Sequence, residues 1–289
     1  MEKIGLVLEG GGVRGAYTAG ALAWLQDNNI TFDYSVGISS GAVYLSCFLC
    51  GNKETPKNLA TVYATDPKVV GAWSLLKNGH YVDYAKVFNE DLLGKEKLSM
   101  QKIIDEKPDM EVGVYDLELG KTVYYGPEAM DEQLTILRGA ASLPVASAIV
   151  DYKGRKLLDG GITKMIPIER ALEKGCTKCL VIMTKPCDYV RKPSSPAVLA
   201  MMKVIYSKYP MVCKDYAVRH LNYYKQMDLI NRLVEEGKAI DVRPSKDIPV
   251  SRWKGDKAKC EELYQLGYTD MEELKPKLME FMKKEDDHD

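Results

Sequence analysis

The first fifty residues alternate twice between a short apolar run and a helical pattern, and this alternation constrains the fold more than any other feature. Residues 3–8 form an apolar run typical of a buried strand, and residues 16–26 predict a helix. Residues 32–36 then predict a second strand and residues 42–50 a second helix. Strands that alternate with helices pair in parallel through right-handed crossovers. The sequence therefore predicts an α/β fold in which helices cover a mainly parallel sheet.

The rest of the chain continues this pattern less regularly. Helices are expected at 58–70, 84–93, 131–141, 168–174, 197–236 and 256–284, the last of them broken near Gly267. Strands are expected at 110–116, 121–125, 156–158, 179–184 and 239–243, and the first two of these form a hairpin around Leu119-Gly120. Residues 185–196 contain three prolines and predict a loop.

The length of 289 residues is sufficient for one large α/β domain, or for a domain with an appendage. We expect a catalytic core at 3–185, a helical part at 186–245 that packs on or completes this core, and a helical extension at 246–289. The 40 basic and 41 acidic residues give a net charge of -1. Because this balance produces no overall attraction for nucleic acid, we expect no nucleic-acid partner.

No segment predicts export or membrane insertion. The apolar run at 4–8 is too short for the core of a signal peptide, and no stretch approaches the ~20 apolar residues of a membrane-spanning helix. We expect a cytoplasmic protein, with peripheral contact at a membrane surface as an open alternative. The oligomeric state does not follow from the sequence.

Two cysteine pairs, Cys47-x-x-Cys50 and Cys176-x-x-Cys179, have a spacing found in zinc sites. They lie far apart in the sequence, and each sits in an apolar run without the glycine or proline pattern of a zinc knuckle. We therefore expect reduced, buried cysteines and no bound metal.

A glycine-rich loop, Gly10-Gly11-Gly12-Val13-Arg14-Gly15, joins the first predicted strand to the first predicted helix. Glycine lets the backbone turn tightly and leaves its N–H groups unobstructed, and the helix N-terminus behind them favours negative charge. The loop fits two kinds of site, a dinucleotide-binding fingerprint or an oxyanion hole for acyl transfer. By itself it does not decide between them.

A second loop, Gly37-Ile38-Ser39-Ser40-Gly41, joins the second predicted strand to the second predicted helix. It has the G-x-S-x-G pattern of a nucleophile elbow, in which a sharp turn exposes the serine and the flanking glycines avoid clashes. The pattern is common by chance, and its position between a strand and a helix is what favours catalysis. Ser39 is therefore the candidate nucleophile, and we interpret Ser40 as structural.

Histidine, the usual base for such a serine, is scarce in this chain. His80 lies in a predicted loop, His220 in the C-terminal helical region and His288 in the terminal tail, and none has surroundings typical of a Ser-His-Asp triad. Asp159 begins the sequence Asp159-Gly160-Gly161 after a short strand, and an aspartate there can take the serine proton directly. A carboxylate with a pKa of ~3.9 is a weak base, so we expect partial burial and contact with the serine to raise its basicity.

Together the three motifs resemble those of the patatin-like phospholipases, which carry a G-G-G-x-R/K-G loop, a G-x-S-x-G elbow and a D-G-A/G motif in this order. The resemblance covers residues 3–185, and the segment at 140–144, which ends in a proline, also resembles the family. More loosely, Trp253 and residues 263–268 resemble the C-terminal extension of bacterial members. The resemblance implies a three-layer α/β/α fold with a central, mainly parallel sheet and a helical C-terminal region.

The same resemblance implies a Ser-Asp dyad. Ser39 would attack an ester carbonyl and Asp159 would accept its proton, after which water activated by the same aspartate would release the acyl group. The oxyanion hole would be formed by the loop residues Gly10, Gly11, Gly12 and Arg14, chiefly by the backbone N–H groups of Gly11 and Gly12. Arg14 would order the loop or face the negative charge. The supporting glycines of the three motifs would be Gly15, Gly37, Gly41, Gly160 and Gly161.

These expectations disfavour the dinucleotide reading of the loop. A ribose-binding carboxylate belongs at the end of the second strand, whereas Asp33 lies at its start and the serine elbow occupies its end. We therefore expect no cofactor and, because the dyad supplies both nucleophile and base, no catalytic metal.

The family implies a lipid or other acyl ester as substrate. The apolar residues within 197–236 fit either a surface that meets a membrane or, as we favour, a helix stripe packed on the core. They are Met201, Met202, Ile205, Tyr206, Tyr209, Met211 and Val212. Two functions from different classes remain at this stage: a serine lipid acyl hydrolase, or a catalytically silent or regulatory lipid-binding protein on the same fold.

Overall fold

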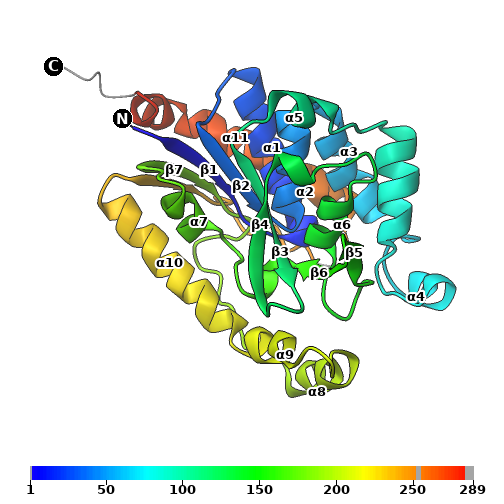
Figure 1. The fold of residues 1–289 in the computed structure, drawn as a ribbon. Coiled ribbons are helices and arrows are strands. Elements are labelled where there is room, and N and C mark those ends of the chain that lie inside the picture. Colours follow the sequence, from blue (N-terminus) through cyan, green and yellow to red (C-terminus); the bar gives the residue numbers. More distant parts are fainter. Residues whose placement is uncertain (1, 252–254, 284–289) are drawn as a thin grey trace.

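A mainly parallel sheet of eight strands forms the centre of the computed structural model, which describes residues 2–251 and 255–283 (Figure 1). The strands are β1 (Ile4–Leu8), β2 (Tyr34–Ile38), β3 (Met110–Asp116), β4 (Lys121–Tyr125), β5 (Val150–Tyr152), β6 (Arg155–Asp159), β7 (Lys178–Ile182) and β8 (Ala239–Val242). Their order is β5-β6-β3-β2-β1-β7-β8, and β4 pairs with β3. The predicted α/β class is confirmed.

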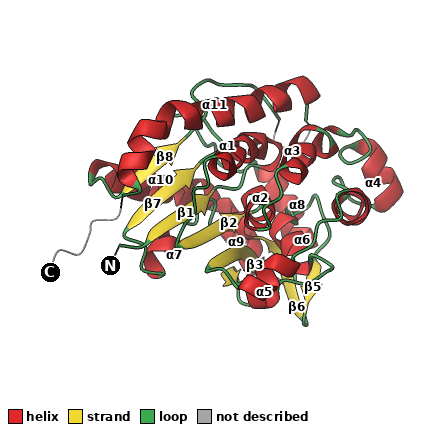
Figure 2. Cartoon of the chain, turned by 90° about the horizontal axis from the view of Figure 1, so that it is seen from above, coloured by secondary structure: helices red, strands yellow, loops and turns green. Residues whose placement is uncertain are grey.

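Helices cover both faces of the sheet. They are α1 (Ala16–Asp27), α2 (Ser40–Leu49), α3 (Glu54–Thr61), α4 (Ala72–Asn78), α5 (Gln101–Glu106), α6 (Thr135–Ala141), α7 (Ile168–Glu173), α8 (Pro196–Ile205), α9 (Pro210–Ala217), α10 (Arg219–Glu235) and α11 (Lys257–Phe281). Figure 2 shows α1, α2 and α11 together on one side of the strands. Successive residues of β1 alternate accordingly, because Leu6 and Leu8 pack with these helices whereas Val7 packs with α7 and α10. This is the predicted three-layer arrangement.

Most predicted elements are present, and the differences have local causes. The hairpin strands at 110–116 and 121–125 are confirmed. The helix expected from residue 131 begins only at Thr135, because Leu134 has a left-handed backbone with φ 56°. The helix expected over 58–70 starts earlier and ends at Thr61. The segment expected as a helix at 84–93 is a π-helix, Lys86–Lys95.

The break expected near Gly267 is wrong, because α11 is continuous through this residue. A Cβ atom on Gly267 would lie 2.1 Å from the Tyr17 carbonyl oxygen of α1, and one on Gly20 would lie 1.9 Å from the Tyr264 carbonyl oxygen of α11. These glycines therefore allow the backbones of α1 and α11 to approach closely. The glycine that suggested a helix end is instead a helix–helix contact.

The C-terminal part of the chain joins the sheet as well as covering it. Strand β8 pairs in parallel with β7, in the register Cys179↔Ala239. From α8 and α9, Met202 and Val212 are buried against Tyr115 of β3, whereas Val204 is 77% exposed. The apolar residues of 197–236 thus divide between core and surface. Among the described residues, no helix has both the length and the apolar content that crossing a membrane requires.

Strands β2 and β6 end against each other along one edge of β3. Strand β2 runs parallel to β3 and its last residue, Ile38, pairs with Gly113. Strand β6 runs antiparallel to β3, and its last residue, Asp159, pairs with Val114. Strand β4 pairs with residues 112–116 along one edge of β3, and β2 and β6 therefore both pair with the opposite edge. Ser39, which follows β2, and Asp159, which ends β6, are therefore brought together.

Candidate active site

Ser39 stands at the sharp turn between β2 and α2. Its backbone has φ 57° and ψ -129°, a conformation rarely adopted by residues with a side chain, which costs about 1–3 kcal/mol. The flanking glycines are required by space: a Cβ atom on Gly37 would lie 2.7 Å from the Ala42 backbone, and one on Gly41 2.8 Å from the Leu8 carbonyl oxygen. The sharp, strained turn predicted for the elbow is therefore present.

Asp159 lies directly beside this serine. The Ser39 hydroxyl donates a 2.6 Å hydrogen bond to Asp159 Oδ2, a length typical of a hydroxyl bound to a carboxylate. Asp159 Oδ1 accepts a 2.7 Å hydrogen bond from the Gly161 N–H. Both residues are buried, with 7% and 2% of their surface exposed, so the exposed serine that the elbow pattern predicts is wrong: Ser39 faces a cavity instead of open solvent. A Cβ atom on Gly160 would lie 2.7 Å from the Gly113 carbonyl oxygen, so glycine allows the turn to reach β3.

The glycine loop passes beside the serine, and its N–H groups have different partners. The Gly10 N–H donates to the Met165 carbonyl oxygen at 3.1 Å, and the Gly11 N–H donates to the Ser40 hydroxyl at 3.0 Å. Gly12 has φ 58°, and its N–H donates to no residue that the structure describes. Gly12 lines the same cavity as Ser39. Of the three glycines, Gly12 thus has the N–H group best placed for a ligand.

Two further loop residues pack beside the site. A Cβ atom on Gly15 would lie 2.5 Å from the Tyr44 ring, so glycine lets the loop lie close to α2. The Arg14 guanidinium stacks over the Tyr189 ring, 5.8 Å from its centre. Arg14 does not line the cavity that contains Ser39 but a separate surface cavity, which also contains Asp188 and Asp247.

A buried ion pair supports the glycine loop from behind, and the sequence analysis missed it. Glu9 directly follows β1, just before the loop, and its carboxylate pairs with the Lys185 ammonium after β7. It also accepts hydrogen bonds from the Thr184 N–H and hydroxyl, at 2.7 and 2.9 Å. Burial by itself raises the pKa of Glu9, but Lys185 and Thr184 outweigh it and lower that pKa. Burial lowers the pKa of Lys185 to about 8. The feature of the sequence that could have revealed this ion pair is a charged residue directly after a buried strand.

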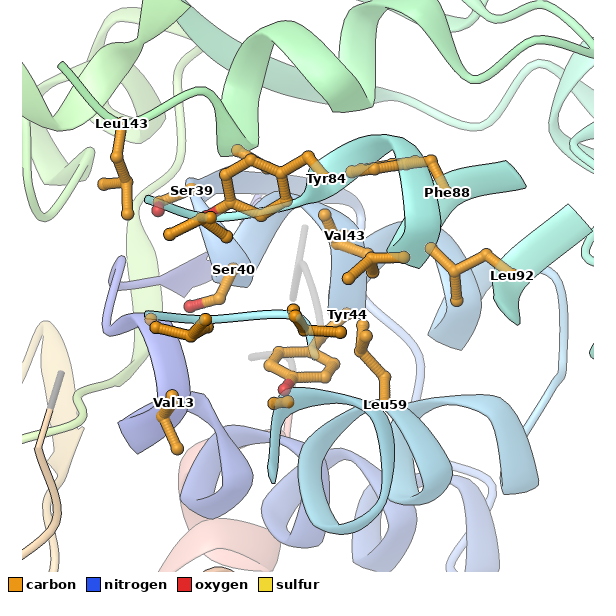
Figure 3. A pocket seen from close by; sticks show the side chains of 17 residues that line it. Val13, Ser39, Ser40, Val43, Tyr44, Leu59, Tyr84, Phe88, Leu92 and Leu143 are labelled. Carbon is orange, nitrogen blue, oxygen red and sulfur yellow. The ribbon is translucent and has the colours of Figure 1, made fainter. Parts of the chain in front are cut away.

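An apolar cavity opens beside Ser39 (Figure 3). It has a volume of about 100 Å³ and extends from Ser39 past Val43 and Tyr84 to Phe88 and Leu92. The two last residues belong to the π-helix, Lys86–Lys95. Apart from the two elbow serines and the Tyr44 and Tyr84 hydroxyls, its side chains are hydrocarbon. The cavity therefore suits an acyl chain whose ester lies at Ser39.

Histidines and cysteines occupy other places. His80 lies in the loop after α4, where its carbonyl oxygen accepts a hydrogen bond from Ser74, and His220 lies at the start of α10 in a surface cavity. His288 and Trp253 lie outside the described residues. All seven cysteines are free thiols, and among the described residues no three potential ligands gather as a metal site would need.

Arg219, in the first turn of α10, is a second residue that the sequence analysis missed. Its Nε donates a hydrogen bond to the Gly161 carbonyl oxygen. A Cβ atom placed on Gly161 would lie 3.0 Å from Asp159 Oδ1 and 3.3 Å from an Arg219 terminal nitrogen, so these groups flank one point. One arginine in a long helical stretch carries no signal in the sequence. The contact places the C-terminal region beside the aspartate turn.

Comparisons with known proteins agree with this architecture. The family model described as "Patatin-like phospholipase" matches residues 6–172, more than half of the chain. A second model, described as "Domain of unknown function (DUF6363)", matches residues 196–283. The first match spans the glycine loop, the serine elbow and Asp159. The second spans Arg219.

Two individual proteins are similar to this chain. The uncharacterized protein YjjU of Escherichia coli (strain K12) is 27% identical over 205 residues, which cover 66% of this chain and 54% of that protein. This chain thus spans about half the length of that relative. The crystal structure of VipD from Legionella pneumophila aligns with a TM-score of 0.51 at 13% identity, over 96% of this chain and 67% of that one. The likeness to VipD concerns the fold.

Proposed function

This chain belongs to the patatin-like phospholipase family, and on that premise we propose that it is a serine hydrolase of lipid acyl esters with a Ser39–Asp159 dyad. The observation that carries the proposal is the 2.6 Å hydrogen bond from the Ser39 hydroxyl to Asp159 Oδ2. It joins a nucleophile in a strained elbow directly to a buried carboxylate.

The reaction proceeds in two halves. Ser39 Oγ bonds to the ester carbonyl carbon while its proton passes to Asp159. The bond to the alcohol oxygen then breaks, and that oxygen takes the proton from Asp159, which leaves the acyl group on Ser39. Water next gives a proton to Asp159 and bonds to the same carbon. The bond to Ser39 Oγ breaks, and Asp159 returns the proton to the serine.

The oxyanion of each intermediate is held by the glycine loop. The Gly12 N–H is the first donor, since it binds no described residue and lines the cavity with Ser39. The Gly11 N–H is the second, and the oxyanion takes the place of the Ser40 hydroxyl that now accepts from it. A preorganised donor of this kind typically contributes a hundredfold or more in rate. The stacking of Arg14 on Tyr189 supports a role in ordering the loop.

The apolar cavity beside Ser39 receives the acyl chain. Transfer of an alkyl chain from water into this hydrocarbon lining is favourable by about 0.8 kcal/mol for each buried methylene group. The lining favours lipid esters over polar acyl compounds.

The test is the release of fatty acid from acylglycerols and lysophospholipids by the whole chain, with Ser39→Ala as the matched control. The proposal expects release that depends on Ser39. The alternative function, a catalytically silent lipid-binding protein, expects fatty-acyl binding without release. Release that persists in the Ser39→Ala protein would contradict the dyad.

A further inference from the structure

A basic cavity lies on the C-terminal side of the candidate active site. It has a volume of about 340 Å³ and is formed by the loop after β7 together with α9 and the start of α10. Its cations are Arg191, Lys192 and Arg219, and no carboxylate of the described residues lines it. Three positive charges in one cavity contrast with the net charge of -1 of the whole chain.

Hydroxyl and imidazole groups accompany the cations. Ser194 and Ser195 line the cavity, and so does His220. The His220 Nδ1 atom is buried and has no hydrogen-bond partner among the described residues. A buried polar atom without a partner is costly, and a bound ligand that exchanges a hydrogen bond with it removes that cost.

Arg219 connects this cavity to the dyad. It lines both the basic cavity and a narrow gap that contains Asp159, Gly161 and Leu143. Leu143 in turn lines the apolar cavity beside Ser39. The apolar cavity, the narrow gap beside Asp159 and the basic cavity therefore follow one another, each sharing a lining residue with the next.

We propose that the basic cavity is a subsite for the phosphate of the substrate, so that the loop after β7 and the helices that follow it select acyl esters with a phosphate headgroup over neutral glycerides. This inference rests on the proposed function. Guanidinium and ammonium groups form charge-assisted hydrogen bonds with phosphate oxygens, and a neutral headgroup offers them no charge.

The side chains are held in place for this role. The Arg191 guanidinium stacks over the Tyr223 ring at 5.1 Å, and its backbone N–H donates to the Tyr224 hydroxyl. Arg219 is fixed by its hydrogen bond to Gly161 and by the Tyr216 ring, 5.4 Å from its guanidinium carbon. Lys192 is exposed at the rim, where an arriving anion meets it first. Rigid donors lose little entropy when a ligand binds.

The test measures hydrolysis of two esters with the same acyl group, lysophosphatidylglycerol and monoacylglycerol, by the whole protein. The ratio of their kcat/KM values is measured for wild type and for the double variant Arg191→Gln/Lys192→Gln. The matched control, Lys203→Gln/Lys208→Gln, removes two exposed charges from the neighbouring helical part outside the cavity. We expect a wild-type ratio that favours the phosphate ester, a fall of about tenfold or more in the double variant through KM, and a wild-type ratio in the control.

Each other outcome contradicts a defined part of the account. A wild type without preference for the phosphate ester, or a double variant that loses both activities equally, overturns the headgroup subsite. Inorganic phosphate separates the two possible sources of the anion. If it inhibits monoacylglycerol hydrolysis through Arg191 and Lys192 while the ester ratio stays near one, the cavity binds a free ion and the proposal is wrong. If neither ester is hydrolysed, the proposed function fails, and binding of lysophosphatidylglycerol to the same variants still tests the subsite.

Discussion

The Ser39 hydroxyl donates directly to Asp159 Oδ2, and the two residues meet because β2 and β6 end against the same edge of β3. One strand is parallel to β3 and the other antiparallel, so their ends point toward each other. The pairing of Ile38 with Gly113 and of Asp159 with Val114 places the two ends at adjacent residues of β3. The contact between Ser39 and Asp159 is therefore set by the pairing of strands in the sheet.

Asp159→Asn should abolish most of the ester hydrolysis while the protein still folds. An amide of the same shape can hold the serine but cannot accept its proton, and a positioned general base typically contributes 10²–10⁴-fold. The measurement is kcat with a short-chain nitrophenyl ester. The matched control is Asp151→Asn, in the exposed hairpin of β5 and β6, which should keep wild-type kcat. A kcat near wild type in Asp159→Asn would rule out the base assignment.

Gly12→Ala should lower kcat by about a hundredfold or more. The residue has φ 58°, where a side chain costs about 1–2 kcal/mol, and relaxation of this strain turns the Gly12 N–H away from the oxyanion. Gly154→Ala is the control, because Gly154 has φ 81° and open space around it in the β5–β6 turn. Both variants should lose similar stability on urea unfolding, and only the first should lose activity. Equal activities would remove Gly12 from the oxyanion hole.

The sequence predicted the strands and the three motifs because their signals are local. Apolar runs, a glycine elbow and an aspartate at a strand end are each contained within a few residues. Gly267 led to a wrong prediction of a helix break, because the contact that requires a glycine there is made with Tyr17 of α1, far away in the sequence. The helix predicted over 58–70 is present only as far as Thr61, after which the chain leaves α3 and forms part of the cavity wall. Contacts across the fold decide such positions.

The same distinction applies to the candidate site. Ser39 and Asp159 are proposed as site residues from their own motifs, whereas Arg219 contacts Gly161 through a hydrogen bond that no spacing in the sequence reveals. The domain boundaries at 185 and 245 remain predictions, although β8 shows that the C-terminal part contributes a strand to the sheet.

Glu9→Gln should destabilise the protein and displace the glycine loop. The variant leaves the buried Lys185 ammonium without its partner, which typically costs about 3–5 kcal/mol. Because the folded protein lowers the pKa of Glu9, its stabilisation is present above the ordinary carboxyl pKa and is lost as pH falls through the lowered one. Urea unfolding should therefore show a gap between wild type and variant at neutral pH that narrows in acid.

The matched control for the ion pair is the double variant Glu9→Gln/Lys185→Met. It removes both charges, so it should be more stable than Glu9→Gln alone. If the double variant loses as much unfolding free energy as Glu9→Gln and Lys185→Met lose in total, or more, Glu9 and Lys185 do not act as a pair.

Leu92→Phe should shift the preference toward shorter acyl chains. Leu92 is fully buried and lies at the end of the cavity farthest from Ser39, so a larger side chain shortens the space for an acyl chain (Figure 3). Activity on nitrophenyl esters of increasing chain length should fall at a shorter chain than in wild type. The control is Leu93→Phe at the adjacent position, which does not line the cavity. An unaltered chain-length profile in Leu92→Phe would place the acyl chain elsewhere.

Labelling by a fluorophosphonate probe tests the central claim most directly, because the probe reacts only with an activated serine and requires no knowledge of the natural substrate. Wild type should be labelled, and so should Ser40→Ala, which removes only the neighbouring hydroxyl. Ser39→Ala should remain unlabelled while its unfolding curve shows a folded protein. Labelling of Ser39→Ala at the wild-type rate would contradict the account.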